Sequence, residues 1–154
     1  MYIRRLFISL FFIAISQTCL FISSCHFNSS YINREEDRKD GEEIIDKFYG
    51  LLINENYKES YKLFDKRFFE VTDTQKLNNI YNLAFNDLGK VESYSIEKWE
   101  TEDIVGTDAR IKYLFQCSVK RSNFASKETL MLIKEKDGIK IISYNVNADT
   151  LSKK

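Results

Sequence analysis

The sequence contains few of the residues on which most enzymatic chemistry depends. Its 154 residues include one histidine (His26), three cysteines, five glycines and no proline. One histidine beside the N-terminal segment excludes a Ser-His-Asp or Cys-His pair on the folded domain, and also a zinc site built from histidines. A glycine-rich phosphate loop is also missing from the sequence. We therefore expect no cofactor and no metal.

The chain also lacks an excess of charge of either sign. Lysines and arginines number 23, and aspartates and glutamates number 23. Such a balance gives no electrostatic reason to bind nucleic acid. Aromatic residues, in contrast, make up 14% of the chain, which favours either a large aromatic core or an aromatic-lined cavity.

The first 24 residues are typical of a secretory signal. Arg4 and Arg5 form a positive start, Leu6 to Ile15 is an apolar run broken by one serine, and a small pair, Ser23-Ser24, follows after more polar residues. This order of charged, apolar and small residues directs a chain out of the cytoplasm.

The end of this segment, Ile22-Ser23-Ser24-Cys25, resembles the lipoprotein box of bacteria. The resemblance implies that Cys25 is acylated and becomes the first residue of the mature protein. The alternatives are ordinary secretion, or an uncleaved anchor over Leu6 to Ile22, which is short for a membrane span and is interrupted by polar residues. In each case we expect the folded part to lie in the bacterial cell envelope, next to a membrane.

Processing at Cys25 determines which cysteines remain available for a disulfide bond. Cys19 would leave with the signal and Cys25 would carry lipid, so Cys117 would be a lone thiol without a disulfide partner. The mature chain would have 130 of the 154 residues, with 21 basic and 23 acidic side chains after loss of Arg4 and Arg5. That length suits one domain with an ordinary apolar core.

A polar stretch separates Cys25 from the first segment with periodic hydrophobic residues, which begins after Asp40. His26 to Asp40 ends in the charged run NREEDRKD. We expect a solvated tether with a typical span of about 20 Å, although a charge run can also be a binding tail. The predicted organisation is a signal peptide over 1–24, a lipidated N-terminus and tether over 25–40, a domain over 41–148 and a tail over 149–154.

Helical spacing of apolar residues predicts three helices in the first half of the domain. The first begins at a capping-box-like Asp40–Glu43 pair and ends at Asn54, and a shorter one follows around Tyr57 to Phe64. The third begins at a Thr72–Gln75 capping box and ends at Gly89. Lys66 to Val71 is ambiguous and is compatible with a short extended piece.

After Gly89 the period changes to two, which predicts strands. We expect four, over the ranges 91–100, 109–120, 129–135 and 139–146, with a turn at Asp137-Gly138 between the last two. In the second strand Cys117 falls on the apolar face, so we expect a buried, unreactive thiol. The predicted fold class is α+β, with three N-terminal helices packed on one face of a curved four-stranded antiparallel sheet.

This order, and the segments EEIIDKFYGLLINENYKESYKLFD and LNNIYNLAFNDLGKVESYSIEKW, resemble the superfamily of nuclear transport factor two, ketosteroid isomerase and polyketide cyclases. Within it the chain is most similar to small bacterial exported proteins of unknown function. The resemblance implies a cone-shaped, cystatin-like architecture that often encloses an apolar pocket.

One alternative within this resemblance is an enzyme like ketosteroid isomerase, which places an acidic base and a phenol inside an apolar cone. Phenols are available from Tyr49, Tyr61, Tyr81 and Tyr113. However, the inward face of the clearest strand carries no acid, and we expect three carboxylates in or beside the predicted strands to point outward: Glu92, Glu97 and Glu128.

The favoured hypothesis is a non-enzymatic envelope lipoprotein that binds a protein or a small apolar ligand. Six aromatic residues are candidates for the lining of a pocket, with a filled core as the alternative: Tyr49, Phe64, Phe85, Trp99, Tyr113 and Phe115. A third hypothesis is an interaction module that uses the open sheet face. Lys112, Gln116 and Lys120 on that face disfavour a large apolar dimer patch there.

Overall fold

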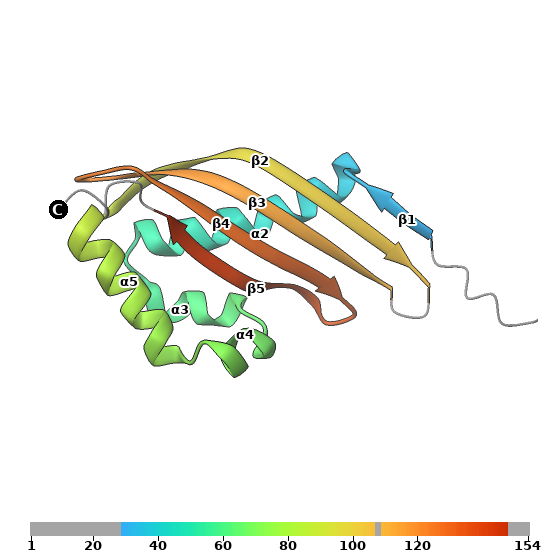
Figure 1. Ribbon diagram of the computed structural model, residues 1–154, viewed down its shortest axis with the longest axis horizontal. Helices are drawn as coiled ribbons and strands as arrows, with labels where there is room; N and C mark the ends of the chain where they lie inside the picture. The colour runs from blue at the N-terminus through green and yellow to red at the C-terminus, as the bar shows by residue number, and fades with distance from the viewer. Residues whose placement is uncertain (1–28, 107–108, 148–154) are drawn as a thin grey trace, which may run out of the picture.

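A sheet of five antiparallel strands forms the centre of the molecule, as shown by the computed structural model, which describes residues 29–106 and 109–147 (Figure 1). The strands lie in sequence order, each beside the next. They are β1 (Ser29–Ile32), β2 (Val91–Val105), β3 (Arg110–Arg121), β4 (Ser126–Glu135) and β5 (Gly138–Asn147).

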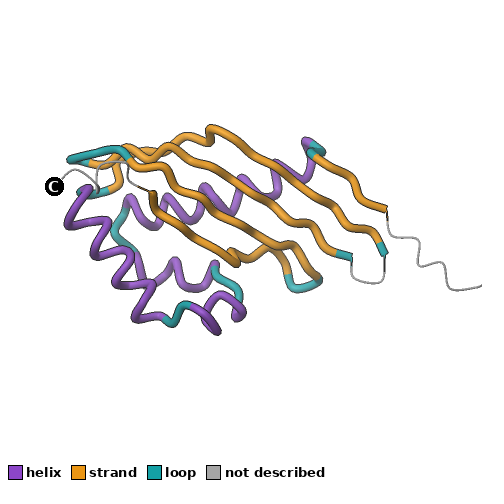
Figure 2. The backbone as a smooth tube through the Cα atoms, in the orientation of Figure 1, coloured by secondary structure: helices purple, strands orange, loops and turns teal. Residues whose placement is uncertain are grey.

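The helices lie between β1 and β2 in the sequence. They are α2 (Glu35–Ile53), α3 (Tyr57–Ser60), the 3-10 turn η2 (Tyr61–Leu63), α4 (Lys66–Val71) and α5 (Thr74–Leu88). The long α2 runs along one face of the sheet, and α3, α4 and α5 gather beside β5 (Figures 1 and 2). The α+β class is therefore confirmed, but the prediction of three helices ahead of all strands is wrong, because β1 precedes them and α4 is a further helix.

The sheet has one strand more than the four predicted, because the polar stretch after Cys25 is not a free tether throughout. Residues 29–32 form β1, which pairs with the far end of β2 from Ser29↔Val105 to Ile32↔Glu102. A four-residue strand, SSYI, is too short to show a period, so sequence pattern misses it.

The first helix also begins earlier than predicted, at Glu35 instead of near Asp40. Glu35, Glu36 and Asp37 occupy its first turn, where acidic side chains interact favourably with the helix dipole. The charged run that we assigned to the tether is therefore the start of α2, and the tether prediction is wrong for residues 29–40.

Two further predictions concern the connections around α5. Residues 66–71 are helical and not extended, with Asp65 as the N-cap whose side chain accepts from the Arg67 amide at 2.9 Å. The next helix is capped by Asp73, which accepts from the Lys76 amide at 2.7 Å, and not by Thr72. As predicted, α5 ends at Gly89. The φ of this residue is 89°, a conformation that glycine adopts without strain.

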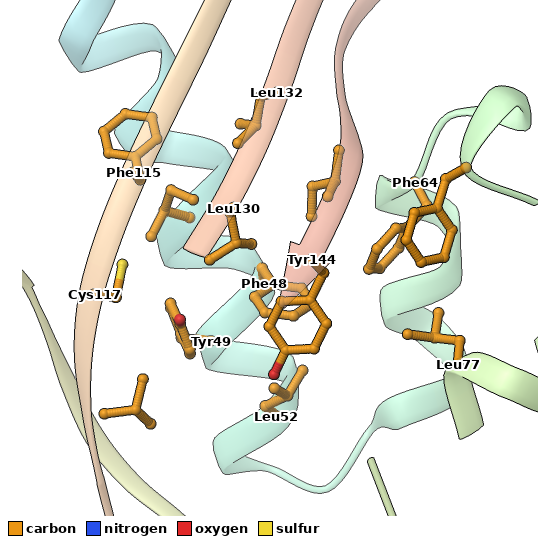
Figure 3. Packing of buried hydrophobic residues seen from close by; sticks show 14 of the residues in the cluster. Phe48, Tyr49, Leu52, Phe64, Leu77, Phe115, Cys117, Leu130, Leu132 and Tyr144 are labelled. Atoms are coloured by element: carbon orange, nitrogen blue, oxygen red, sulfur yellow. The ribbon is translucent and has the colours of Figure 1, made fainter. Parts of the chain in front are cut away.

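The core lies between the sheet and the helices. Strand β3 contributes alternate residues, and α2 contributes Ile45, Phe48, Tyr49 and Leu52, all of them buried (Figure 3). Gly41 marks the closest approach of α2 to the sheet. A Cβ there would lie 2.7 Å from the rings of Tyr113 and Phe115, so a larger residue would push α2 outward.

Candidate functional site

Four of the six aromatic residues predicted to line a pocket are core residues. Tyr49, Phe64, Tyr113 and Phe115 are at most 5% exposed. Tyr49 packs edge-on against Phe48, with ring centroids 5.2 Å apart. Such contacts fill space and support the filled-core alternative, while Tyr113 and Phe64 also border two of the hollows described below.

The other two predicted residues lie outside this core. Trp99 is partly buried, and the Arg38 guanidinium lies over its ring at 5.2 Å. Phe85 is 42% exposed, so the prediction that it lines an interior pocket is wrong. The reason is the helical period of α5, which buries Leu77, Tyr81, Ala84 and Leu88 and leaves Phe85 on its flank.

The core contains a polar cluster that the sequence prediction missed. The Glu128 carboxylate on β4 is fully buried, and both of its oxygens are hydrogen-bonded. Oε1 accepts from Arg121 Nη2 at 2.7 Å and from Ser126 Oγ at 2.9 Å. Oε2 accepts from the hydroxyls of Tyr144 at 2.8 Å and Tyr49 at 3.2 Å. We call these five residues the sealed cluster.

The prediction that Glu128 points outward is therefore wrong. It lies on the same face of β4 as Leu130 and Leu132, which are also fully buried. The spacing of these three residues indicates a shared face, but the predicted strand begins at Thr129 and leaves Glu128 outside it. In contrast, Glu92 and Glu97 do face solvent, paired with Lys120 at 2.8 Å and Lys127 at 3.4 Å.

Burial and charge shift the pKa values of the two tyrosines and the arginine of the sealed cluster upward. Burial and the neighbouring Glu128 charge raise the pKa of Tyr49 and of Tyr144 well above the usual value, so both phenols remain donors. For Arg121, burial lowers the pKa, but the attraction and hydrogen bond of Glu128 outweigh this and leave the pKa raised. The cluster thus ties β3, β4, β5 and α2 together.

The same geometry limits what Glu128 can do chemically. A general base must lie within about 2.6–3.2 Å of the proton that it removes, directly or through one water. Glu128 has no exposed surface, and four protein donors occupy its oxygens. The cluster therefore has the residue types of an acid–phenol site but is closed to a substrate in this structure.

An apolar groove lies directly beside the sealed cluster, between α5 and β5. It has a volume of about 210 Å³ and is open along one side. Its lining consists of Ile80, Leu83, Ala84, Asp87 and Leu88 from α5, and Tyr144, Asn145 and Val146 from β5. Leu83 is 62% exposed. We call this feature the α5–β5 groove.

Two other hollows are larger, and only the second has more polar surroundings than the groove; the first is as apolar as the groove and includes Tyr113 and Leu114. One, of about 400 Å³, includes Lys112 and Glu102, which form an ion pair at 3.0 Å. The other, of about 420 Å³, includes Arg67, which pairs with Asp65 at 2.7 Å and Glu135 at 3.0 Å. Since these charges neutralise each other, they offer little to a charged ligand.

Cys117 is buried, as predicted, at 1% exposure. Burial raises the pKa of its thiol to about 11, against a smaller lowering by a hydrogen bond with Tyr49. The thiolate is the reactive form, so the thiol should react slowly.

Within residues 29–106 and 109–147, no group of three or more acidic, histidine or cysteine side chains is arranged to hold a metal ion. Over the same residues, none of the helices has the length and apolar character needed to cross a bilayer. The predicted signal over 1–24, Cys25 itself and the tail over 149–154 lie outside the described residues.

No protein-family model, curated protein or solved structure matches this chain. The resemblance to the nuclear transport factor two superfamily therefore stays a prediction.

Proposed function

We propose that this chain is a lipid-anchored protein of the bacterial envelope whose domain binds another protein through the α5–β5 groove. The signal order over 1–24 and the lipoprotein-box-like Ile22-Ser23-Ser24-Cys25 support the anchor and the location. We also propose the cone-shaped, cystatin-like architecture, which the long α2 across one face of an antiparallel sheet supports.

The size of the α5–β5 groove is the observation that carries the binding function. Pockets for small molecules usually measure about 300–1,000 Å³ and enclose most of the ligand. This groove measures about 210 Å³ and is open along one side. It is therefore better suited to an apolar side chain of a partner protein than to a whole small ligand.

The chemistry of the groove also fits a protein partner. Ile80, Leu83 and Val146 form its apolar part, while Asp87 and Asn145 supply polar groups. An apolar centre with a polar rim is the usual arrangement of a protein–protein interface. Leu83 is the most exposed apolar residue of α5 and is available as the contact residue.

An enzyme like ketosteroid isomerase is the second candidate, and one observation favours it. Glu128 and the phenol of Tyr144 lie behind the groove, so a carboxylate and a phenol do share an apolar interior. Turnover would require α5 to move away from β5 and Arg121 to release the carboxylate. A small apolar ligand, the second form of the binding hypothesis, requires less movement but more volume.

The anchor is tested by metabolic labelling with a fatty acid in cells that produce the full chain. We expect label on the wild-type protein and none on Cys25→Ala, which should be released from the membrane fraction. Equal labelling of the two proteins contradicts the lipid anchor.

The binding function is tested with a photo-cross-linking residue placed in cells at Leu83 and, as a matched control, at Val71. Val71 is also apolar and is 77% exposed, but lies on α4 away from the groove. We expect a discrete adduct at position 83 that is absent at position 71.

The partner found in this way is then purified for a binding measurement. Leu83→Glu should weaken its affinity about tenfold or more, as expected for a central contact residue, and Val71→Glu should leave it unchanged. Equal effects of the two variants contradict the proposal. A small molecule that co-purifies in native mass spectrometry, and is lost in Leu83→Glu, supports the small-ligand alternative instead.

A further inference from the structure

The ordered domain begins much closer to Cys25 than the sequence alone indicates. Strand β1 starts at Ser29, four residues after the cysteine. An extended chain covers at most about 3.3–3.6 Å per residue, so four residues reach about 14 Å at most. A lipid on Cys25 would therefore hold β1 at the bilayer surface.

Exposed apolar side chains gather where β1 meets the end of β2. Tyr31 is 51% exposed, Ile32 is 70% exposed and Val105 is 43% exposed. Val105 lies opposite Ser29 in the β1–β2 register, so Val105 and Tyr31 lie on one face at this end of the sheet, while Ile32, opposite Glu102, lies on the other face. Figure 1 shows β1 and the tip of β2 together, at the end of the molecule far from α5. We call Tyr31, Ile32 and Val105 the apolar tip.

Acidic side chains outnumber basic ones near the apolar tip, since Glu36, Asp37 and Asp103 all share the Arg34 guanidinium. Arg34 contacts Asp37 at 2.7 Å and Asp103 at 2.6 Å, and the Tyr31 ring lies 5.4 Å from its guanidinium. Lys112 pairs with Glu102 at 3.0 Å. Contact with a membrane at this end would thus depend on apolar and aromatic groups, and tyrosine is a residue that favours the membrane interface.

We propose that the apolar tip docks on the interface of the membrane that holds the Cys25 lipid, with Tyr31, Ile32 and Val105 among the headgroups. This inference depends on the proposed lipid anchor. Docking at this end would direct the α5–β5 groove, at the other end of the molecule, away from the membrane and toward a partner (Figure 1). The short connection between Cys25 and β1 would thus set the orientation of the domain as well as its location.

The test uses the processed, lipidated full-length protein in vesicles of zwitterionic phospholipid. A polarity-sensitive fluorophore is attached to Ile32→Cys, to Val105→Cys or, as control, to Val71→Cys on α4. Cys117 is buried, with its thiol pKa raised to about 11, so the introduced cysteine is labelled selectively, and unsubstituted protein measures the background. Brominated acyl chains in the vesicles quench fluorophores that reach the interface.

We expect a blue shift and a loss of intensity with brominated lipid at positions 32 and 105, unchanged by high salt, and neither effect at position 71. An Ile32→Asp substitution should reduce the quenching at position 105 while the protein stays bound to vesicles. Equal signals at all three positions overturn the docking, and quenching that requires anionic lipid or disappears in salt overturns its apolar nature.

Failure of the anchor gives a different result. If Cys25 carries no lipid, neither wild-type protein nor Cys25→Ala is labelled by fatty acid, and the two float with vesicles to the same extent. If the wild type floats but position 32 is not quenched, the anchor stands and only the docking is wrong.

Discussion

The two polar clusters that contact α2 differ in how completely they are enclosed and bonded. In the sealed cluster, the side chains of Arg121 and Glu128 are 4% and 0% exposed, and they meet at 2.7 Å. At the start of α2, the Arg34 side chain is 34% exposed and contacts Asp37 and Asp103, which are 5% and 14% exposed. We call these last three residues the N-terminal cluster.

Hydrogen bonding shows the same difference. Both oxygens of Glu128 have partners, whereas Thr101 Oγ1 and Tyr113 OH, which lie near the N-terminal cluster, are buried without one. The pKa of Tyr113 is raised by burial and by the charges of Asp40, Asp37 and Asp103. The sealed cluster is thus a finished part of the core, while the N-terminal cluster is accessible to solvent and close to the apolar tip. Stability should depend on the first far more than on the second.

The largest effect is expected from Arg121→Met, which leaves the Glu128 charge buried without its ionic partner. Removal of one member of a buried pair typically costs about 3–5 kcal/mol of unfolding free energy. The double variant Arg121→Met/Glu128→Gln should recover much of this loss, because no buried charge remains. Urea denaturation at neutral pH measures both.

Arg34→Met is the matched control, since it removes an arginine from the N-terminal cluster. The Arg34 side chain is 34% exposed, so water can take its place beside Asp103 and at the outer side of the buried Asp37, and the loss of stability should be smaller than for Arg121→Met. Equal losses for Arg121→Met and Arg34→Met would contradict the distinction between the clusters.

Tyr144→Phe should have the next largest effect. It removes the hydroxyl that donates to Glu128 at 2.8 Å, and hydrogen bonds to charged groups contribute about 1.5–3 kcal/mol each. Tyr49→Phe should cost less, because its bond to the same oxygen is longer, at 3.2 Å. Thermal and urea unfolding give both values, and a larger loss for Tyr49→Phe would reverse the assignment.

Sequence pattern predicted the parts of the fold that repeat over many residues. Alternation in β3 predicted that Tyr113, Phe115 and Cys117 face inward, and helical spacing predicted α5, although Phe85, expected to face inward, is 42% exposed. Strand β1 could not be found in this way, since four residues define no period. Its position depends on long-range pairing with β2.

The inward position of Glu128 could be predicted from the sequence, but its hydrogen-bond partners could not. Glu128 is two residues before Leu130 and four before Leu132, which places all three side chains on one face of the strand. An acid at such a core position nevertheless contradicts simple hydrophobic patterning. What makes Glu128 acceptable there is Arg121 at the end of the neighbouring strand, together with phenols from α2 and β5. The registers of β3 with β4 and of β4 with β5, together with the packing of α2, bring these groups together, and the sequence pattern does not specify these registers.

Alkaline pH should weaken the sealed cluster gradually. The pKa values of Tyr49 and Tyr144 are raised in the folded protein, so the unfolded chain loses these protons first, near the ordinary value of about 10. Their contribution to stability is therefore complete below pH 10 and is lost as the pH rises above it, by up to about 1.4 kcal/mol per pH unit for each group. Urea titrations between pH 8 and 11 measure the slope, which should be shallower in Tyr144→Phe. A stability that is flat up to pH 11 would contradict the raised pKa values.

The smallest effect is expected from Tyr113→Phe, which removes a hydroxyl that has no hydrogen-bond partner. The ring stays in place against Gly41 and Phe115, so packing is conserved. Because a buried, unbonded hydroxyl costs folding free energy, the variant should be as stable as the wild type or more stable by up to about 1 kcal/mol. Thr101→Val should behave in the same way, since Thr101 lies opposite Tyr113 in the register and its hydroxyl is also unpartnered. Thermal unfolding of both, beside Tyr144→Phe, makes the comparison direct. A loss in Tyr113→Phe as large as that in Tyr144→Phe would show that both hydroxyls are bonded and that the two ends of the core are built alike.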